Sequence, residues 1–322
     1  MDCTSPVIDF HVHFLVREVL EQCLPHAVAT NRGHHQLPPH LFALFDKMMT
    51  PQGVIDDMDR LQIDMSVISS AAVIEPTYWA EPDLALKLSQ QLNDTAATWA
   101  ANSPKRLIGS FVLPLQDMDL AMRELQRAVN DLDLRVANVP AEVRGIYMGD
   151  TRFRPFWEAA QELGVVTFMH PDGAKDPWFF QWGMWNSLGQ SLEEAKFMAS
   201  VIFEGILESY PGLKLVMAHG GGYCPHNMGR LDRNVKNAHS MKNITRKPSE
   251  YLRNFYYDTC LYDPTVLSAL VKVVGPDRLL LGADWPIGEA DPLGFVDRCT
   301  DLNEADRRLI KGGRTAALVG VP

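Results

Sequence analysis

Two histidines near the start of the chain lie two residues apart, in a run that reads VIDFHVHF. If this run is a strand, the side chains of His11 and His13 point to one face, while Phe10, Val12 and Phe14 point to the other. Two imidazoles on one face begin a site for a divalent metal ion, because imidazole nitrogen is a common ligand of such ions. The alternative for this motif alone is a pair of histidines on an exposed strand edge.

Three further polar residues end apolar runs, at positions where an ordinary hydrophobic core would have Val or Leu. His170 follows VVTFM, His219 lies in LKLVMAHGGG, and Asp284 lies in RLLLGADWP. Each one alone is better explained as a buried histidine with its own partner, or as an aspartate that caps a helix. Together with the two earlier histidines they predict a metal site, because the strand ends of a parallel barrel meet at one mouth. The glycines at 220–222 either bring backbone close to a substrate or form a flexible turn.

Eight apolar runs alternate with amphipathic segments, and most are apolar through their length, which is typical of strands buried on both faces of a parallel sheet. The segment 117–132 has apolar residues at helical spacing and Asp117 as a candidate N-cap, and 152–163 and 192–210 follow the same pattern. This alternation predicts an α/β fold, a (β/α)8 TIM barrel. An open doubly wound sheet is the alternative, although the first run carries histidines instead of a glycine fingerprint. The predicted strands are 7–14, 66–70, 107–115, 143–149, 165–171, 214–222, 255–260 and 279–286.

Composition limits the classes of protein that this chain can belong to. Its 322 residues, 46% of them apolar, suffice for one barrel domain over residues 1–322. With 30 Lys and Arg against 40 Asp and Glu the net charge is −10, which disfavours nucleic-acid binding. The five cysteines, Cys3 among them, lack CxxC spacing, so neither a disulfide framework nor a thiolate zinc site is indicated. No apolar run is long enough to cross a bilayer, and we expect a soluble, cytoplasmic protein.

The motifs VIDFHVH, FMHP, AHGGG and LLLGADWP resemble those of the amidohydrolase superfamily. More narrowly, the chain is similar to the group around 2-amino-3-carboxymuconate 6-semialdehyde decarboxylase. Further similar stretches are TYWAEP at 77–82, HGGGYCPHNMGR at 219–230 and YYDTCLYDP at 256–264. The resemblance runs from Asp9 to Leu318 and implies a barrel with one metal ion at its mouth.

The resemblance also implies a role for individual residues. The metal ligands would be His11, His13, His170 and Asp284, with zinc as the expected ion and manganese as the alternative. His219 matches the histidine that activates water or moves a proton, and Asp284 would share in that proton transfer. Arg230 matches an arginine that reaches a neighbouring subunit's active site and binds a substrate carboxylate, so the resemblance implies a homodimer.

Two features bear on the substrate. The decarboxylase group has a second carboxylate-binding arginine before its second strand, and here HLFALFDKMM, with Phe42, Leu44 and Phe45, occupies that stretch. A less acidic or more aromatic substrate is therefore favoured. The segment WFFQWGMW follows a strand end, so Trp182 and Trp185 could stack on a flat conjugated substrate, or they could form a subunit interface instead.

We therefore expect a metal-dependent nonoxidative decarboxylase, a carbon–carbon lyase, that acts on a small aromatic or conjugated carboxylic acid. The same ligands also suit a hydrolase of a C–C, ester, lactone or thioester bond in the breakdown of aromatic compounds, because metal-activated water attacks carbonyl groups. A barrel used only for binding is disfavoured because the ligand set is complete.

Overall fold

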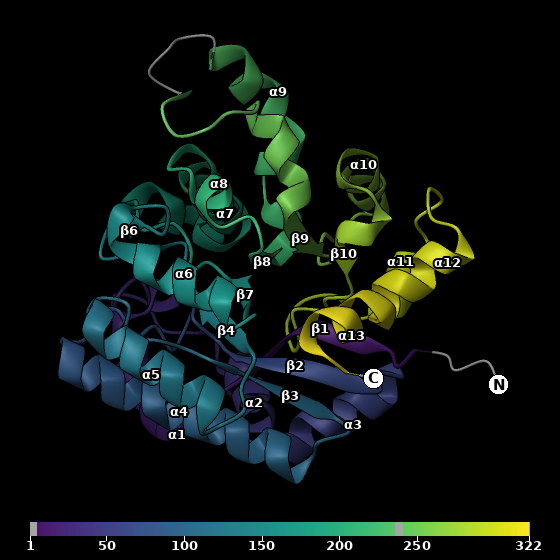
Figure 1. Ribbon diagram of the computed structural model, residues 1–322. Helices are drawn as coiled ribbons and strands as arrows, with labels where there is room; N and C mark the ends of the chain where they lie inside the picture. The colour runs from purple at the N-terminus through teal and green to yellow at the C-terminus, as the bar shows by residue number, and fades with distance from the viewer. Residues whose placement is uncertain (1–4, 236–240, 322) are drawn as a thin grey trace.

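In the computed structural model, which describes residues 5–235 and 241–321, eight parallel strands form one sheet (Figure 1). Strands that follow one another around the sheet also follow one another along the chain, and helices connect them, which confirms the predicted (β/α)8 barrel. The strands are β1 Ile8–Phe14, β2 Met65–Ser70, β3 Leu107–Phe111, β4 Val136–Val139, β7 Val166–Met169, β8 Lys214–Met217, β9 Phe255–Asp258 and β10 Leu279–Leu280.

The sheet closes between its first and last strands. Beyond the short β10, Trp285 forms a parallel bridge with Val12, and its N–H donates to the carbonyl of His11 at 3.2 Å. The N–H of His13 donates to the carbonyl of Trp285 at 3.1 Å. This closure brings Asp284 beside the two histidines of β1.

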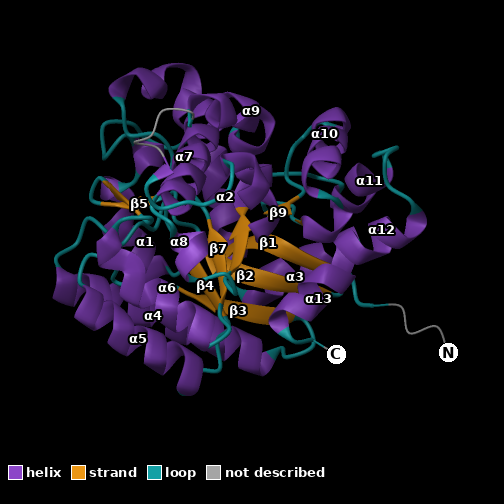
Figure 2. Ribbon diagram, turned by 45° about the horizontal axis from the view of Figure 1, so that its top comes forward, coloured by secondary structure: helices purple, strands orange, loops and turns teal. Residues whose placement is uncertain are grey.

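Helices surround the strands, which lie in the middle of the molecule (Figure 2). Several begin at a residue that caps them, as Asp117 does for α5 by accepting a hydrogen bond from the N–H of Leu120 at 3.0 Å. The helices are α1 Arg17–Cys23, α2 Pro39–Met48, α3 Pro51–Leu61, α4 Pro82–Asn102, α5 Met118–Asn130, α6 Arg154–Glu162, α7 Met184–Phe203, α8 Ile206–Ser209, α9 Cys224–Asn234, α10 Pro264–Val274, α11 Pro292–Asp297, α12 Glu304–Arg308 and α13 Arg314–Val319.

The predicted fourth strand, 143–149, is wrong. The barrel strand is β4, and the predicted stretch instead contains most of a small antiparallel hairpin formed by β5 Glu142–Val143 and β6 Ile146–Tyr147. Its two loop residues, Arg144 and Gly145, have φ values of 51° and 86°, as a tight hairpin turn requires. The true strand has only four residues and includes the polar Asn138, so its apolar signal is weak.

Two other local predictions need correction. The predicted helix 192–210 is split, because Gly205 with φ 71° ends one helical stretch and starts another, so α7 and α8 are separate. The side chain of Phe10 does not lie apart from that of His11, since both rings pack against Phe168, at centroid distances of 5.4 and 5.0 Å. The register of β1 against β2 shifts between Asp9 and Val12, which disturbs the simple alternation.

Within residues 5–235 and 241–321, none of the helices has the length and apolar character that crossing a lipid bilayer requires. The cysteines in the described part of the chain, Cys23, Cys224, Cys260 and Cys299, are buried and free, whereas Cys3 lies outside the described residues.

Candidate metal centre and active site

Four side chains from both ends of the chain meet at the mouth of the barrel. His11 and His13 come from β1, His170 follows β7, and Asp284 lies in the segment that closes the barrel; all four are buried. One potential ligand atom from each lies within 4.8 Å of all the others. The strand-end prediction is thereby confirmed for this set, and it depends on parallel strands that end at the same rim.

Three of the four ligand atoms are especially close. The Nε2 atoms of His11 and His13 are 3.1 Å apart, and they lie 3.2 and 3.0 Å from Oδ1 of Asp284. Donor atoms bound to one ion at about 2 to 2.2 Å lie roughly 3 Å from each other. The spacing therefore fits a single divalent ion.

Contacts at Nδ1 fix the orientation of two of the imidazole rings. Nδ1 of His11 lies 2.6 Å from Oδ2 of Asp258, and Nδ1 of His170 lies 2.9 Å from the carbonyl of Pro171. Each contact holds a proton on Nδ1 and leaves the lone pair of Nε2 for a metal ion. Nε2 of His170 is buried and has no hydrogen-bond partner among the described residues. An orphaned acceptor of this kind supports the assignment of a metal ligand.

The charges around the centre favour a cation. Burial lowers the pKa of His11, but Asp284 and Asp258 outweigh burial and raise that pKa to about 9. Burial raises the pKa of Asp284, yet its histidine neighbours, led by His11, hold it well below its usual range. Burial and the other imidazoles keep the pKa of His170 well below its ordinary value, so this ligand is neutral. His170 therefore offers a neutral imidazole, and Asp284 an ionised carboxylate, to a positive ion.

His219 lies beside this group, directly after β8. Its Nδ1 is 2.5 Å from Oε1 of Glu194 on α7, and its Nε2 is 3.6 Å from Oδ2 of Asp284. Burial lowers the pKa of His219, but Glu194 and Asp284 outweigh this and raise it well above the usual value. Nε2 has no hydrogen-bond partner among the described residues. His219 is therefore placed as a charged imidazole with a free N–H next to the metal ligands.

The glycines after His219 make room for this arrangement. Gly220, Gly221 and Gly222 all have positive φ, at 61°, 76° and 58°. A Cβ atom on Gly222 would lie 2.5 Å from Oε2 of Glu194, so any side chain there would displace the partner of His219. The backbone angles show a tight turn at these glycines, and the close approach of their backbone to a substrate stays a prediction.

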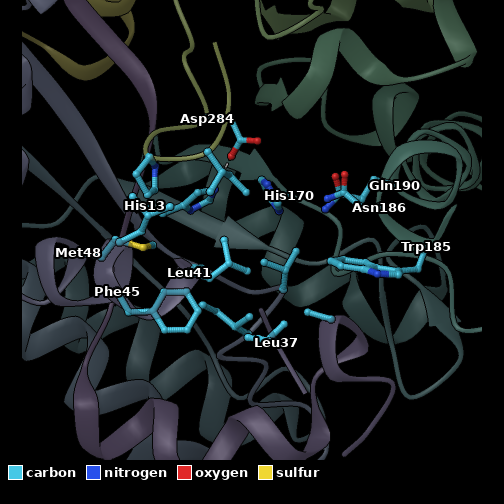
Figure 3. Close-up of a pocket in the computed structure, with 17 residues that line it drawn as sticks. His13, Leu37, Leu41, Phe45, Met48, His170, Trp185, Asn186, Gln190 and Asp284 are labelled. Atoms are coloured by element: carbon cyan, nitrogen blue, oxygen red, sulfur yellow. Dashed lines mark hydrogen bonds and ion pairs between the residues drawn. The ribbon is translucent and has the colours of Figure 1, made fainter. Parts of the chain in front are cut away.

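Two cavities meet at Asp284. The first, which we call the apolar cavity, has a volume of about 290 Å³ and is drawn in Figure 3. Its lining includes His13 and His170 on one side and apolar residues from α2 and the neighbouring loops on the other. The second, the polar cavity, has a volume of about 390 Å³, and its lining includes His219, His226 and Tyr262. Asn186, Gln190, Asp284 and Ile287 line both cavities.

The predicted substrate-binding residues lie in different places. Trp185, in the first turn of α7, lines the apolar cavity (Figure 3). Trp182 has 77% of its surface exposed and lines neither of the two cavities. Arg230 lies on α9, exposed, and also outside both linings. Substrate binding by Trp182 and Arg230 stays a prediction, and for Arg230 it needs a second copy of the chain.

Sequence reasoning missed three groups at the site. Asp258 ends β9 in the same way as the ligands end their strands, so its position was a usable signal. Glu194 lies inside a helix, one residue from the equally buried Glu193, and no local pattern separates the two. Tyr262, whose hydroxyl lies 3.5 Å from Oδ2 of Asp284, follows β9 in a loop.

Comparisons with known proteins find relatives over most of the chain. The family model described as Amidohydrolase matches residues 8–320. The 2-amino-3-carboxymuconate-6-semialdehyde decarboxylase of Dictyostelium discoideum is 30% identical over 277 residues, which are 84% of this chain and 77% of that protein. The gamma-resorcylate decarboxylase of Rhizobium radiobacter is 30% identical over 285 residues, covering 81% of this chain and 83% of the relative.

A solved structure shares the fold over almost the whole length. The dihydroxybenzoic acid decarboxylase of Polaromonas sp. JS666, determined with bound manganese and the inhibitor 2-nitroresorcinol, superposes with a TM-score of 0.84 at 26% identity. The match covers 98% of this chain and 97% of that one.

Proposed function

Because the chain belongs to the amidohydrolase family, we propose that it is a metal-dependent nonoxidative decarboxylase of an aromatic or conjugated carboxylic acid. The observation that carries this proposal is the position of His219. Its Nε2, which has no hydrogen-bond partner in the part of the chain that the structure describes, lies 3.6 Å from Oδ2 of Asp284 at the edge of the metal group, where it can deliver a proton to a bound substrate. Both relatives named above are decarboxylases, which supports a carboxy-lyase rather than a hydrolase.

His11, His13, His170 and Asp284 would hold a divalent ion. When bound, such an ion supplies Lewis-acid chemistry, which holds substrate oxygens and draws electron density from the conjugated system. Three imidazoles and a carboxylate suit zinc, and we propose zinc as the ion. The manganese in the Polaromonas enzyme makes that ion the alternative. Activity of metal-free protein after reconstitution with each ion decides between them.

The residues of the chain supply the proton chemistry. His219 donates the proton on Nε2 to the ring carbon that carries the carboxylate, while Glu194 holds Nδ1 and steadies the charged imidazole. The bond between that carbon and the carboxylate carbon then breaks. Its electron pair stays on the ring, carbon dioxide leaves, and the new C–H bond keeps the proton. Asp284 Oδ2, 3.6 Å from Nε2, keeps the imidazole aimed at the reacting carbon and shares in returning its proton.

Two further proposals concern the assembly and its location. We propose a homodimer in which Arg230 binds a substrate carboxylate in the partner's site, because this exposed arginine lies outside the cavities of its own chain. We also propose a cytoplasmic location, which suits the free cysteines of the described chain.

The test of the function uses His219→Asn in metal-loaded protein. We expect the release of carbon dioxide from hydroxybenzoates and carboxymuconates to be lost, while metal content measured by elemental mass spectrometry stays the same, since His219 is not among the ligands. Unchanged turnover would remove His219 from the mechanism. Reactions run in ¹⁸O-labelled water test the class of reaction, because incorporation of label into a new carboxylate, without release of carbon dioxide, would make the enzyme a hydrolase.

A further inference from the structure

We propose that the apolar cavity is a subsite for an apolar substituent of the substrate, so that the enzyme prefers aromatic acids with an alkyl or aryl group and no second acidic group. This inference rests on the proposed decarboxylase function and names the substrate class of the same site.

The size of the apolar cavity is the first argument. An apolar protein cavity of about 150 Å³ is enough to hold benzene. The apolar cavity has about 290 Å³, so a substrate ring that enters it leaves space for a substituent of similar size. The cavity begins at His13, His170 and Asp284. The proposed function places the carboxylate of the substrate there. A ring held there therefore directs its far edge toward α2.

The chemistry of the lining is the second argument. Among the lining residues that the structure describes, the only ionisable ones are the three metal-site residues His13, His170 and Asp284. The polar side chains that remain, Asn186 and Gln190, lie at the border with the polar cavity. A carboxylate placed deeper would lose its hydration with no cation to pair with. A hydrocarbon group gains from the same surroundings.

Helix α2 makes the apolar wall. Leu41, Leu44, Phe45 and Met48 recur at three- and four-residue spacing, so they share one face of the helix. Leu37, just before the helix, extends this wall, and Figure 3 shows Leu37, Leu41 and Phe45 on the side of the cavity opposite Asp284. The stretch that departs from the decarboxylase group in sequence is therefore the one that determines what fits beyond the ring.

The two cavities would bind different edges of the substrate ring. The polar cavity, with His226, Tyr262 and Ser191 in its lining, suits hydroxyl groups and water on the side of His219. The apolar cavity suits the substituent on the side of His13. A substrate that carries polar groups on one edge of the ring and hydrocarbon on the other matches both.

The test is a panel of 2-hydroxybenzoates with a methyl, propyl or pentyl group at each open ring position, and with a carboxylate at the same positions. At one position we expect kcat/KM for decarboxylation to rise by about fourfold for each added methylene, until the cavity is filled. We expect a carboxylate at that position to lower kcat/KM by at least about 100-fold, since a buried charge without a partner is costly. The proposal is overturned if no position gains from alkylation, or if the carboxylate is tolerated as well as the alkyl group.

Leu41→Arg tests the wall itself, because it places a cation in the apolar cavity. We expect the ratio of kcat/KM for the alkyl substrate to that for the carboxylate substrate to fall by at least about tenfold. Ala43→Arg is the matched control: it adds the same charge to α2 at a side chain that is exposed and outside the lining. The control should leave the ratio unchanged, and an equal fall in both variants would contradict the subsite.

Two measurements keep the inference separate from the proposed function. If no compound releases carbon dioxide, the decarboxylase proposal fails, and the subsite is then tested by calorimetric binding of 3-alkylphenols to metal-loaded protein. If compounds are decarboxylated without any gain from alkyl groups, the subsite fails and the function stands. Should Leu41→Arg not fold, Leu41→Ala replaces it: the enlarged cavity should move the preference toward longer alkyl chains.

Discussion

His219 and Asp284 hold backbone conformations that residues with a side chain adopt rarely. Their φ values are 47° and 56°, in the left-handed region. Each such conformation costs roughly 1 to 3 kcal/mol and persists only where neighbouring contacts compensate. Here the compensation comes from Glu194 for His219 and from the imidazoles for Asp284. The two residues to which we assign the proton transfer thus share this backbone conformation, and Nε2 of His219 lies 3.6 Å from Oδ2 of Asp284.

At this scale we predict that Glu194→Gln lowers kcat by about 100-fold with little change in KM. The variant keeps the shape of the side chain but removes the charge that orients His219 and stabilises its charged form. Because a merely structural role would also lower thermal stability, the melting temperature is measured together with steady-state kinetics.

Glu193→Gln is the control for this prediction. Glu193 is the neighbouring buried glutamate on α7, and its Oε2 accepts a hydrogen bond from the hydroxyl of Tyr147 at 2.7 Å, away from His219. Equal losses of kcat in the two variants would show that charge on this helix, rather than contact with His219, is what matters. Glu194→Asp, which keeps the charge, should recover part of the activity.

The ligands could be predicted from the sequence because two signals mark them. His11 and His13 lie two residues apart in the first strand, and His170 and Asp284 follow apolar runs whose ends meet at one rim of a parallel barrel. Glu194 could not be, because a buried carboxylate inside a helix has no local signature and acquires its role only when α7 packs beside the turn after β8.

Among the elements, β9 carries the residue that orients a ligand. Asp258 accepts from Nδ1 of His11 at 2.6 Å and from the N–H groups of Gly220 and Cys260, each at 3.1 Å. We predict that Asp258→Asn weakens metal affinity by roughly 10- to 100-fold, as loss of such partners usually does. Competition with a chelator measures this directly, without any assay of turnover.

Asp133→Asn serves as the control for that measurement. Asp133 is exposed, and its φ of 52° is one that Asn tolerates well, so the exchange alters charge without disturbing the fold. A metal affinity of Asp258→Asn equal to that of this control would contradict the role assigned to β9.

The loops after β1 and β2 are joined by a buried carboxyl group. Glu75 accepts from the N–H of Val16 at 2.8 Å and from the hydroxyl of Ser70 at 3.2 Å. Burial raises the pKa of Glu75 to about 8, although these two hydrogen bonds lower it in part. The folded protein therefore keeps this proton at pH values where the unfolded chain, with the ordinary pKa of 4.5, has released it.

Because of Glu75, the free energy of unfolding falls as the pH rises from about 4.5 to about 8. Above pH 8 this group causes no further fall. We predict that Glu75→Gln removes most of this decline in the free energy of unfolding, which amounts to about 5 kcal/mol over the window. Urea denaturation of both proteins at a series of pH values checks the prediction. Parallel curves for wild type and variant would show that Glu75 is ionised throughout.

The elements themselves were predictable to different degrees. Long apolar strands and the capped α5 were found, since burial and capping leave clear patterns. The fourth strand was missed because β4 has four residues and a central Asn138, while the β5–β6 hairpin nearby is the stronger β signal. The prediction of β structure at 143–149 was therefore largely correct, but its assignment to the barrel sheet was wrong.

For the whole molecule, the prediction concerns assembly. Arg230→Ala should weaken substrate binding by roughly 10- to 100-fold, the range expected for loss of a charge-assisted hydrogen bond, with the melting temperature unchanged. Arg233→Ala, an exposed arginine on the same helix, is the matched control and should bind substrate normally. Light scattering measures whether the wild-type protein and both variants are dimers.

A mixing experiment separates a role in the partner's site from a role in the protein's own site. In a hybrid of His219→Asn and Arg230→Ala subunits, one site has an intact His219 and receives an intact Arg230 from the other chain. Random reassociation should then restore about one quarter of the wild-type sites. No recovery, in protein shown to be dimeric, would place Arg230 in the site of its own subunit or outside catalysis.

The contact that closes the barrel is also a place where the protein can unfold locally. Its first and last strands are held together by few backbone hydrogen bonds around Trp285, and the metal ligands lie on both sides of this seam, two on β1 and Asp284 beyond β10. An ion bound there fastens the two ends of the polypeptide to each other. Amide protons near the seam should therefore exchange with deuterium much faster after chelation, while those of β3 and β4, which carry none of the ligands, keep their protection.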